Sequence, residues 1–506
     1  MPNNEFGDFQ TPIVLATQCL KTLKLPSHAR ILEPTCGAGS FLQAAADIAP
    51  RSERMGVEIN PDYAKKASAW GKVQHRNVFE LELSSPVWGN TDAPLFIIGN
   101  PPWVTSAELR RMNSRNLPPK ENFKGAKGLE AILGSSNFDV SEFIILKALR
   151  ENARQTLTLG MLCKTQVVRN VIEYAARTGL SIFDAAIYRI DAMHWFGAGV
   201  DACWFTLKMC PNAKADYTVK IFDDIFDEGA TSSARFGIVD SRLVSDVDQY
   251  LCIREADGKS PYEWRSGLKH DASKVFELIA CPQPTTRSGV TLDLEPEYIF
   301  PFLKSTDIFR GRHKQLNKWV IVPQMEFGAE TSYLRYSAPK LWNYLMANSE
   351  VLDGRKSSIY RNQPRFSVFG HGAYTFAPYK VVISGLHKEP VFRLVTPIEN
   401  RPVVVDDTCY MLPFDDPTEA LIVTTILNSP ECLALINSLV FRDSKRPITK
   451  KLLARVDLNC LPVEPLEIIK RAQELANDVG LPFDVDRGLG MIGHLGSVEA
   501  TMGALF

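Results

Sequence analysis

The sequence lacks several features that would place it in a class at once. No run of 18 apolar residues occurs, which argues against a membrane span, and the N-terminus lacks the basic and apolar segments of a secretory signal. None of the ten cysteines has C-x-x-C spacing and none of the eight histidines has an H-x-x-x-H partner, so we expect neither a metal site nor a disulfide framework. Internal repeats and low-complexity tracts are also missing. These absences favour a globular protein of the cytoplasm.

The chain has 506 residues, too many for one ordinary core, so we expect two or three domains. Its first 210 residues alternate short apolar runs with helical patterns. Strands are predicted at 30–32, 54–58, 94–99, 157–163, 182–190 and 203–209, and helices at 41–49, 61–69 and 140–152. This alternation predicts an α/β fold with a Rossmann-like, mostly parallel sheet covered by helices on both faces.

The pattern changes near residue 215. Aspartates and small residues dominate the next segment, so we interpret 1–215 as a first domain and 216–260 as a connector. Proline, aromatic residues and short β-like runs then predict a second domain of mixed α+β type at 261–465, followed by a C-terminal tail at 466–506. Beyond about Gly480 this tail is rich in glycine, and we expect it to be loosely held.

A glycine turn follows the first predicted strand. Gly37 and Gly39 allow a ligand to approach the backbone, but Phe41 follows and the third glycine of a dinucleotide-binding loop is missing. The acidic Glu33 just before the turn disfavours a phosphate and favours a ligand with cationic groups. S-adenosylmethionine carries an ammonium and a sulfonium and no phosphate. A plain tight turn is the alternative interpretation.

Glu58 ends the next predicted strand, 19 residues beyond Gly39. A carboxylate at this place can accept hydrogen bonds from both ribose hydroxyls of an adenosine. The alternative is that Glu58 caps a helix or is an ordinary surface acid. The nearby glycine turn favours the role in ligand binding.

The string Asn100-Pro101-Pro102-Trp103 directly follows a buried-strand run. An amino nitrogen conjugated to a ring is a poor nucleophile, and two acceptors for its N–H bonds would restore its lone pair. The Asn100 side-chain oxygen and the Pro101 carbonyl can be those acceptors, since the prolines hold the backbone rigid. Trp103 offers a flat face on which a base can stack. The string predicts methyl transfer to an amino group, achieved by positioning and hydrogen bonds, without a metal or a covalent intermediate.

With these motifs the sequence resembles the gamma-type amino-methyltransferases of bacterial restriction–modification systems, which methylate adenine N6 in DNA. The resemblance rests on the order of a Thr-Pro motif at 6–12, the glycine loop at 33–41, Glu58, the Asn-Pro-Pro-aromatic string and a later recognition domain. It covers the first 210 residues well, and 264–271 and 366–385 less specifically. It implies that 1–215 is the catalytic domain and 261–465 the target-recognition domain.

The resemblance also implies roles for single residues. The cofactor, S-adenosylmethionine, would be contacted by Thr11, Glu33, Thr35, Gly37, Glu58, Asn77 and Pro102. Asn77 stands where the family usually has Asp, but its oxygen can accept the same bond from the adenine amino group. Asn100, Pro101 and Trp103 would hold the target base, which would be flanked by Phe9 and Phe196, with Trp195 and Trp204 as alternatives to Phe196. Trp103 departs from the more usual Tyr or Phe and implies a roomier pocket.

Three basic segments suggest where DNA binds. Lys and Arg outnumber acids by six to two in 105–127, by eight to two in 354–401 and by six to one in 441–455. We expect contacts from Arg355, Lys356, Tyr360, Arg361, Arg365, Lys445 and Arg446, although each is open to interpretation as an ordinary surface residue. The resemblance implies a monomer that flips its base out of duplex DNA and works beside a separate restriction endonuclease.

Other functions remain open at this point. A protein-glutamine N5 methyltransferase shares the Asn-Pro-Pro-aromatic string but lacks a 200-residue basic domain after it. A cytosine-N4 methyltransferase usually has Ser in place of Asn100. An inactive DNA-binding subunit would not need an intact Asn100 and Glu58. No carboxylate-carboxylate-Lys constellation points to a fused nuclease.

Overall fold

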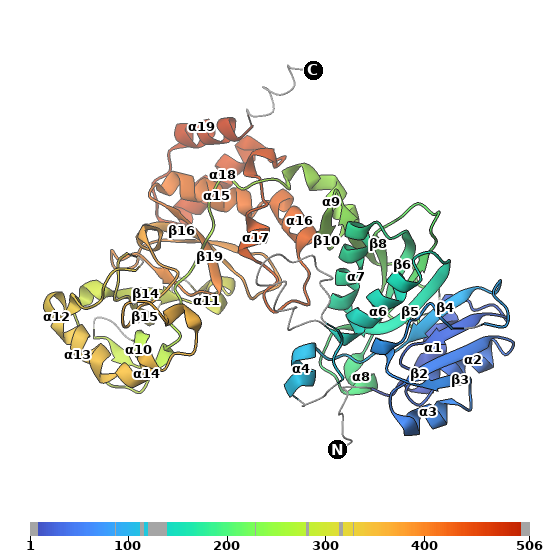
Figure 1. Ribbon diagram of the computed structural model, residues 1–506. Coiled ribbons are helices and arrows are strands. Elements are labelled where there is room, and N and C mark those ends of the chain that lie inside the picture. The colour runs from blue at the N-terminus through green and yellow to red at the C-terminus, as the bar shows by residue number, and fades with distance from the viewer. Residues whose placement is uncertain are drawn as a thin grey trace. The chain divides into compact units, whose positions relative to one another are not determined.

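The computed structural model describes residues 9–86, 88–111, 116–119, 139–227, 229–279, 283–312, 317–326 and 328–496. It divides into two compact units, Met1–Asp248 and Gln249–Phe506 (Figure 1). Residues 6–8 of the Thr-Pro motif and much of the basic segment 105–127 lie outside the described residues.

The first unit is built on a ten-stranded sheet of order β10-β9-β8-β6-β7-β5-β4-β1-β2-β3. Its strands are β1 Arg30–Glu33, β2 Glu53–Glu58, β3 Lys72–His75, β4 Leu95–Gly99, β5 Leu157–Lys164, β6 Ile182–Ile190, β7 Ala202–Met209, β8 Thr218–Phe222, β9 Ala234–Val239 and β10 Arg242–Val244. β3, β2, β1, β4 and β5 run parallel, and β7 inserts antiparallel between β5 and β6. The predicted α/β class and the six predicted strands are confirmed.

Helices cover both faces of this sheet. They are α1 Ile13–Leu23, α2 Ser40–Ile48, α3 Pro61–Ala67, α4 Ser106–Arg111, α6 Val140–Glu151, α7 Thr165–Thr178 and α8 Ala192–Phe196, with a 3-10 turn, η1, at Val78–Glu80. Phe96 and Ile98 of β4 pack with α1 and α2 in one buried cluster. The intervening Ile97 is fully buried and faces the other side, because side chains alternate along a strand. The sheet is therefore apolar on both faces, as a parallel sheet between helices requires.

The α2 helix begins at a glycine for two reasons. Gly39 has φ +93°, a conformation that residues with a Cβ rarely adopt, and a Cβ there would lie 2.9 Å from Ala67 Cα in α3. Asn60 caps α3 by accepting from the N–H groups of Asp62 and Tyr63. These two features fix the loops that follow β1 and β2, where the motifs lie.

The predicted connector at 216–260 is wrong for most of its length. β8 pairs parallel with β6, β9 pairs with β8, and β10 pairs with β9, so this segment extends the large sheet. Val219 and Ile221 alternate inward along β8, but aspartates in the flanking turns hide this short pattern in the composition. The sheet-bearing unit ends near Asp248 rather than at residue 215.

The second unit contains a four-stranded sheet of order β11-β19-β16-β17 and a five-stranded sheet of order β13-β12-β15-β14-β18. The strands are β11 Arg265–Ser266, β12 Glu277–Ile279, β13 Thr285–Thr286, β14 Ile299–Leu303, β15 Lys318–Ile321, β16 Tyr379–Ser384, β17 Phe392–Val395, β18 Val404–Val405 and β19 Cys409–Phe414. This confirms the predicted mixture of strands and helices in the second half of the chain.

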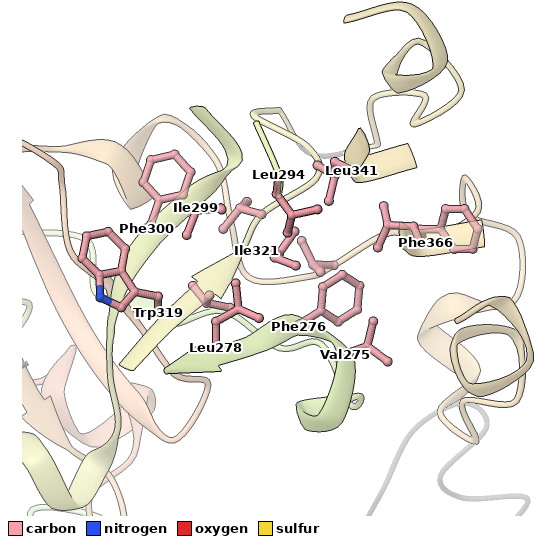
Figure 2. Packing of buried hydrophobic residues seen from close by; sticks show 14 of the residues in the cluster. Val275, Phe276, Leu278, Leu294, Ile299, Phe300, Trp319, Ile321, Leu341 and Phe366 are labelled. Atoms are coloured by element: carbon pink, nitrogen blue, oxygen red, sulfur yellow. The ribbon is translucent and has the colours of Figure 1, made fainter. Parts of the chain in front are cut away.

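Helices of the second unit are short except near its end. They are α9 Val247–Ile253, α10 Ser273–Phe276, α11 Ser305–Phe309, α12 Leu334–Ser337, α13 Pro339–Ala347, α14 Ser349–Asp353, α15 Pro417–Leu427, α16 Pro430–Leu439, α17 Lys450–Leu453, α18 Pro465–Val479 and α19 Val485–Gly496. Short 3-10 turns are η2 Arg254–Ala256, η3 Pro296–Tyr298, η5 Ser358–Tyr360, η6 Ala373–Phe376 and η7 Leu458–Cys460. Figure 2 shows the core of the five-stranded sheet, where Phe276, Trp319 and Ile321 pack together.

The predicted loose tail is also wrong as far as residue 496. Ile468, Ile469, Ala472 and Ala476 recur at helical spacing in α18 and are buried, and α18 packs on α15 and α19. Within the described ranges, no single helix is long and apolar enough to span a membrane. The bent pair α15 and α16, at 59°, passes that test by length and composition when taken together.

Candidate functional site

A cavity of about 280 Å³ opens at the carboxyl ends of β1, β2 and β4. β1 lies between β2 and β4, so the chain leaves neighbouring strands in opposite directions here, which is where open α/β sheets bind ligands. The lining includes the predicted Phe9, Thr11, Glu33, Thr35, Gly37, Glu58, Asn77, Asn100 and Pro102. The structure therefore brings together motifs that lie up to 93 residues apart in the sequence (102 − 9).

Gly37 forms the floor of this cavity next to the N-terminal segment. Its φ is +50°, and a Cβ there would lie 2.7 Å from the side-chain oxygen of Gln10. That oxygen accepts from the Ala38 N–H at 2.9 Å. Sequence reasoning missed Gln10, whose only signal was its place beside the predicted Thr11.

Glu58 is held by two backbone N–H groups. Gly37 donates to one carboxylate oxygen at 2.8 Å and Asn60 donates to the other at 2.7 Å. These bonds orient the carboxylate toward the cavity that it lines. Each oxygen keeps further accepting capacity, so the predicted contact with ribose hydroxyls fits the geometry.

Glu33 is buried beside the same cavity, with 2% of its surface exposed. Burial raises the pKa of this carboxyl well above its ordinary value, the negative charge of Glu58 raises the pKa further, and a hydrogen bond from the Leu42 backbone opposes both. Within the described residues, its Oε2 atom is buried without a hydrogen-bond partner. A cationic ligand would relieve both the charge repulsion and the missing bond, so S-adenosylmethionine fits this site.

Asn77 lines the cavity and also caps η1. Its side-chain oxygen accepts from the Phe79 N–H at 3.1 Å, and its amide nitrogen donates to Glu80 at 3.4 Å. The oxygen therefore faces a turn of the chain rather than lying free. Its second lone pair is what the predicted contact with an adenine amino group would use.

Asn100 is fixed by its amide nitrogen. That nitrogen donates to the Phe9 carbonyl at 3.1 Å and to the Thr11 hydroxyl at 3.2 Å. Among the described residues, the side-chain oxygen of Asn100 is buried and has no hydrogen-bond partner. An unpaired buried acceptor is costly, so a site with this arrangement is prepared to receive a donor.

Three aromatic rings meet beside Asn100. Phe9, Trp103 and Phe196 have ring centroids 5.1–5.7 Å apart. The Trp103 ring is 5% exposed and its indole N–H donates to the Leu162 carbonyl at 3.2 Å. The stacking of a base on Trp103 stays a prediction, and in this structure the ring packs against Phe9 and Phe196.

The two alternatives to Phe196 have other positions. Trp195 stacks on Phe226, with centroids 5.7 Å apart. Trp204 is fully buried in β7, stacks on Phe41 and donates to the Thr22 hydroxyl at 2.9 Å. Of the three candidates, Phe196 is the one in contact with both Phe9 and Trp103.

The predicted DNA contacts in the second unit divide into two groups. Arg355 donates to the carbonyls of Leu352, His270 and Ser367, so it holds three chain segments together. The prediction that Arg355 contacts DNA conflicts with this internal role. Arg365 pairs with Asp353 at 2.7 Å.

The other predicted contacts have fewer partners within the fold. Tyr360 is half-buried, and its hydroxyl lies 3.5 Å from the Lys269 carbonyl. Lys356, Arg361 and Lys445 are exposed, and Arg446 is exposed and lies 3.5 Å from Asp407. The basic segment 354–401 therefore contains fewer available cations than its composition suggests.

Comparison with known proteins gives the chain a family. It is 37% identical over 470 residues to the type II methyltransferase M.NspV of Nostoc sp., an alignment that covers 90% of this chain and 97% of that protein. Its fold matches the type IIL restriction–modification enzyme MmeI, solved in complex with DNA, with a TM-score of 0.53 and 13% identity over 96% of this chain and 71% of that one. No family model matches. The predicted cofactor, S-adenosylmethionine, is confirmed. The chain belongs to the type II methyltransferases of restriction–modification systems.

Proposed function

We propose that this enzyme transfers a methyl group to adenine N6 at a specific site in duplex DNA and so protects that DNA from a cognate endonuclease. The observation that carries the proposal is the side-chain oxygen of Asn100, which is buried without a hydrogen-bond partner among the described residues and lies beside the cavity of about 280 Å³. The relationship to M.NspV and the fold shared with MmeI, which was solved with DNA, support DNA as the substrate.

The chain's own residues prepare the nucleophile. The Asn100 oxygen and the Pro101 carbonyl accept the two N–H bonds of the adenine amino group, which draws its lone pair out of conjugation with the ring. Phe9 and Thr11 hold the opposite end of the Asn100 amide, so its oxygen keeps this direction. S-adenosylmethionine, when bound, supplies an electrophilic methyl group. No side chain needs to accept a proton before attack, because the amino group is neutral. The N–CH3 bond forms as the S–CH3 bond breaks, the cofactor departs as its neutral thioether, and the cationic methylated nitrogen releases one proton to solvent.

Glu33 and Glu58 hold the cofactor in this proposal. Glu33 contributes an unsatisfied acceptor for the ammonium group, and Glu58 receives the ribose hydroxyls. Thr35, Gly37, Asn77 and Pro102 complete the lining. Positioning the two reactants in line accounts for most of the rate acceleration expected of such a site.

A base in a duplex must be flipped out to reach Asn100. The contacts among Phe9, Trp103 and Phe196 mean that the entering base replaces ring–ring contacts with ring–base contacts. Such an exchange conserves buried apolar area, and stacking on an aromatic ring contributes about 1–3 kcal/mol per base. We propose that these rings form the adenine pocket and that the enzyme acts as a monomer with a separate endonuclease.

The alternative acceptors are a protein glutamine and cytosine N4. Both carry an amino or amide nitrogen that the Asn100 oxygen can accept from, so the test must identify the product. The enzyme is incubated with tritiated cofactor and either plasmid DNA or cell protein, and labelled DNA is digested to nucleosides. We expect N6-methyladenine. Label in protein alone, or in N4-methylcytosine, would overturn the proposal.

Two substitutions separate the chemistry from cofactor binding. Asn100→Ala removes the acceptor and should lower the single-turnover rate by about 100-fold or more. Asn100→Asp keeps an acceptor but places an oxygen against the Phe9 carbonyl, so it should retain part of the activity. Calorimetric titration with S-adenosylmethionine should give nearly unchanged affinity for both variants. Full activity of Asn100→Ala would contradict the mechanism.

A further inference from the structure

Three loops of the second unit are joined at one end of the four-stranded sheet. They are residues 309–312 from the last residue of α11 onward, 385–388 after β16, and 442–446 after α16, and together we call them the basic edge. Phe309 stacks on His387 with ring centroids 4.0 Å apart. The Gly385 N–H and the Ser305 hydroxyl both bond to the Thr408 carbonyl, which ties the first two loops to the start of β19.

The third loop reaches the same place. Arg446 lies 3.5 Å from Asp407, which precedes Thr408 in the chain. A Cβ on Gly385 would lie 3.3 Å from the carbonyl oxygen of Ile448, so these two segments are in close contact. The basic edge is therefore one continuous part of the second unit, although it is drawn from segments more than 130 residues apart (442 − 309).

Cations on this edge are available to a partner. Arg310, Arg312, Lys388 and Lys445 are exposed, and none of the four forms an ion pair with a carboxylate in the described part of the chain. In contrast, Arg365 is neutralised by Asp353. The acids nearby are Asp443 within the third loop, exposed Glu389, and Asp407, which is paired with Arg446. Arg442 and Arg446 add to the four exposed cations, so six cations face three acids and the balance of charge is positive. Such a cluster fits the phosphates of a nucleic acid.

His387 differs from these exposed cations because contacts within the fold hold its ring in place. It lies between Phe309, on which it stacks, and Ser384, whose hydroxyl lies 2.6 Å from the ring Nδ1. The ring is thus held in one orientation by two contacts. Its other nitrogen, Nε2, has no hydrogen-bond partner in the described residues and is not sealed in the interior.

The surroundings also favour one protonation state. Partial burial and the charge of Arg310 lower the pKa of His387 below its ordinary value, so the ring is neutral at physiological pH. The Ser384 oxygen already accepts from the Leu386 N–H at 3.2 Å, which favours its hydroxyl donating to Nδ1. The remaining ring proton then sits on Nε2, and His387 presents a fixed hydrogen-bond donor.

We propose that the basic edge is the DNA-reading surface of this enzyme, with Arg310, Arg312, Lys388 and Lys445 on phosphates and His387 donating to a base edge in the major groove. A neutral donor matches the N7 and O6 acceptors of guanine or the O4 acceptor of thymine. Leu386, 42% exposed beside it, offers an apolar contact of the kind made with a thymine methyl. This inference rests on the proposed function and adds the residues that set specificity.

The test begins with the parent enzyme in full length. Sequencing of methylated DNA from an expressing strain identifies the site, and a duplex oligonucleotide carrying that site becomes the probe. Absence of methylated DNA would defeat the proposed function, and this inference with it. Variants are then compared on that duplex and on duplexes with single base-pair changes.

Two sets of variants separate phosphate contacts from base reading. Arg310→Gln with Lys388→Gln should weaken binding to all duplexes alike and reduce the slope of log affinity against log salt by about 2. Lys259→Gln with Lys470→Gln is the matched control, since both lysines are exposed cations outside the edge. His387→Gln should lower kcat/KM for the cognate duplex by about 10-fold and narrow its advantage over one altered base pair.

Thermal unfolding of each variant checks that the second unit remains folded. The proposal is overturned if the parent methylates DNA but the double cation variant keeps its affinity and salt slope. It is also overturned if the control pair loses affinity as strongly, or if His387→Gln retains the parent's discrimination at every position of the site. Each of these outcomes leaves the methylation chemistry intact.

Discussion

The amide nitrogen of Asn100 and the hydroxyl oxygen of Thr11 lie 3.2 Å apart, joined by a hydrogen bond across 89 residues of the chain. An asparagine amide can be placed in two orientations that differ by exchange of nitrogen and oxygen. The Thr11 hydroxyl and the Phe9 carbonyl, at 3.1 Å, both lie on the nitrogen side. The N-terminal segment thereby fixes the orientation of the oxygen, which we propose to be the acceptor for the substrate amino group.

Thr11→Val should therefore slow methyl transfer without weakening cofactor binding. It removes one of two bonds to the Asn100 nitrogen, worth about 0.5–1.5 kcal/mol or roughly 2- to 12-fold in rate. Thr11→Ser retains the hydroxyl and should restore the rate. Single-turnover kinetics and calorimetric titration with S-adenosylmethionine check this. A rise in the cofactor's Kd with an unchanged rate would mean that Thr11 serves the cofactor instead.

Glu33 should make stability depend on pH. Its pKa is raised in the folded protein, so above the ordinary carboxyl pKa of about 4 the folded state binds more protons than the unfolded state. Stability from this group is full below that value and is lost as pH rises toward the folded pKa. Glu33→Gln should be more stable than the parent at neutral pH and lose this advantage under acid conditions. Unfolding temperatures across pH test it, and parallel profiles would count against it.

Cofactor binding should also depend on the ionisation of Glu33. The ammonium of S-adenosylmethionine favours the ionised form of Glu33, so binding should release a proton and affinity should rise with pH. Calorimetry in two buffers of different ionisation enthalpy measures the proton. Glu33→Gln should bind more weakly, with no proton released. Equal proton release by parent and variant would assign it to another group.

Gly39→Ala should destabilise the first unit more than Gly179→Ala. Both glycines have positive φ, which costs alanine about 1–2 kcal/mol. A Cβ at Gly179 meets open space, whereas one at Gly39 lies 2.9 Å from Ala67 Cα. The steric overlap of this Cβ with Ala67 should cost a further ~1–3 kcal/mol in the free energy of unfolding. Urea unfolding followed by circular dichroism gives both values, and equal losses would show that α2 and α3 can move apart.

Arg355→Ala should lower stability, whereas Arg361→Ala should not. The Arg355 guanidinium donates to three backbone carbonyls and lies over the Tyr360 ring at 3.8 Å. Loss of these charged hydrogen bonds should cost about 2 kcal/mol or more, while exposed Arg361 should stay within about 0.5 kcal/mol. Thermal unfolding of the two variants decides the matter. A stable Arg355→Ala with weakened DNA binding would restore the interpretation from sequence.

The catalytic half could be predicted closely from sequence because its chemistry follows its strands. Glu33, Glu58 and Asn100 each end or directly follow a buried strand, and parallel strands bring such positions to one edge. The apolar pattern of a strand could not be recognised at β8, where only two buried residues, Val219 and Ile221, lie between aspartate-rich turns. A strand this short has too few positions for its alternation to outweigh composition.

The charged surface of the second unit could not be predicted as well, because a charge in a sequence does not show its partner. Arg355 and Arg365 looked equivalent to Lys445, yet two of the three are satisfied within the fold. His387 gave no signal at all, since Phe309 and Arg310 lie beside it and Ser384 only after two distant segments of the chain meet. Trp103 lies against Phe9 and Phe196, which the sequence also singled out, but its bond to the Leu162 carbonyl depends on packing.

The division of the chain at Asp248 has a consequence for how such enzymes change. Each unit has a core of its own, around Trp204 in the first and Trp319 in the second, so neither needs the other's apolar residues to exclude water. Recombination near the boundary at Asp248 can therefore replace the whole second unit in one step. With the second unit reading the target, as we propose, a lineage built this way acquires a new target sequence in a single event and inherits its chemistry unaltered.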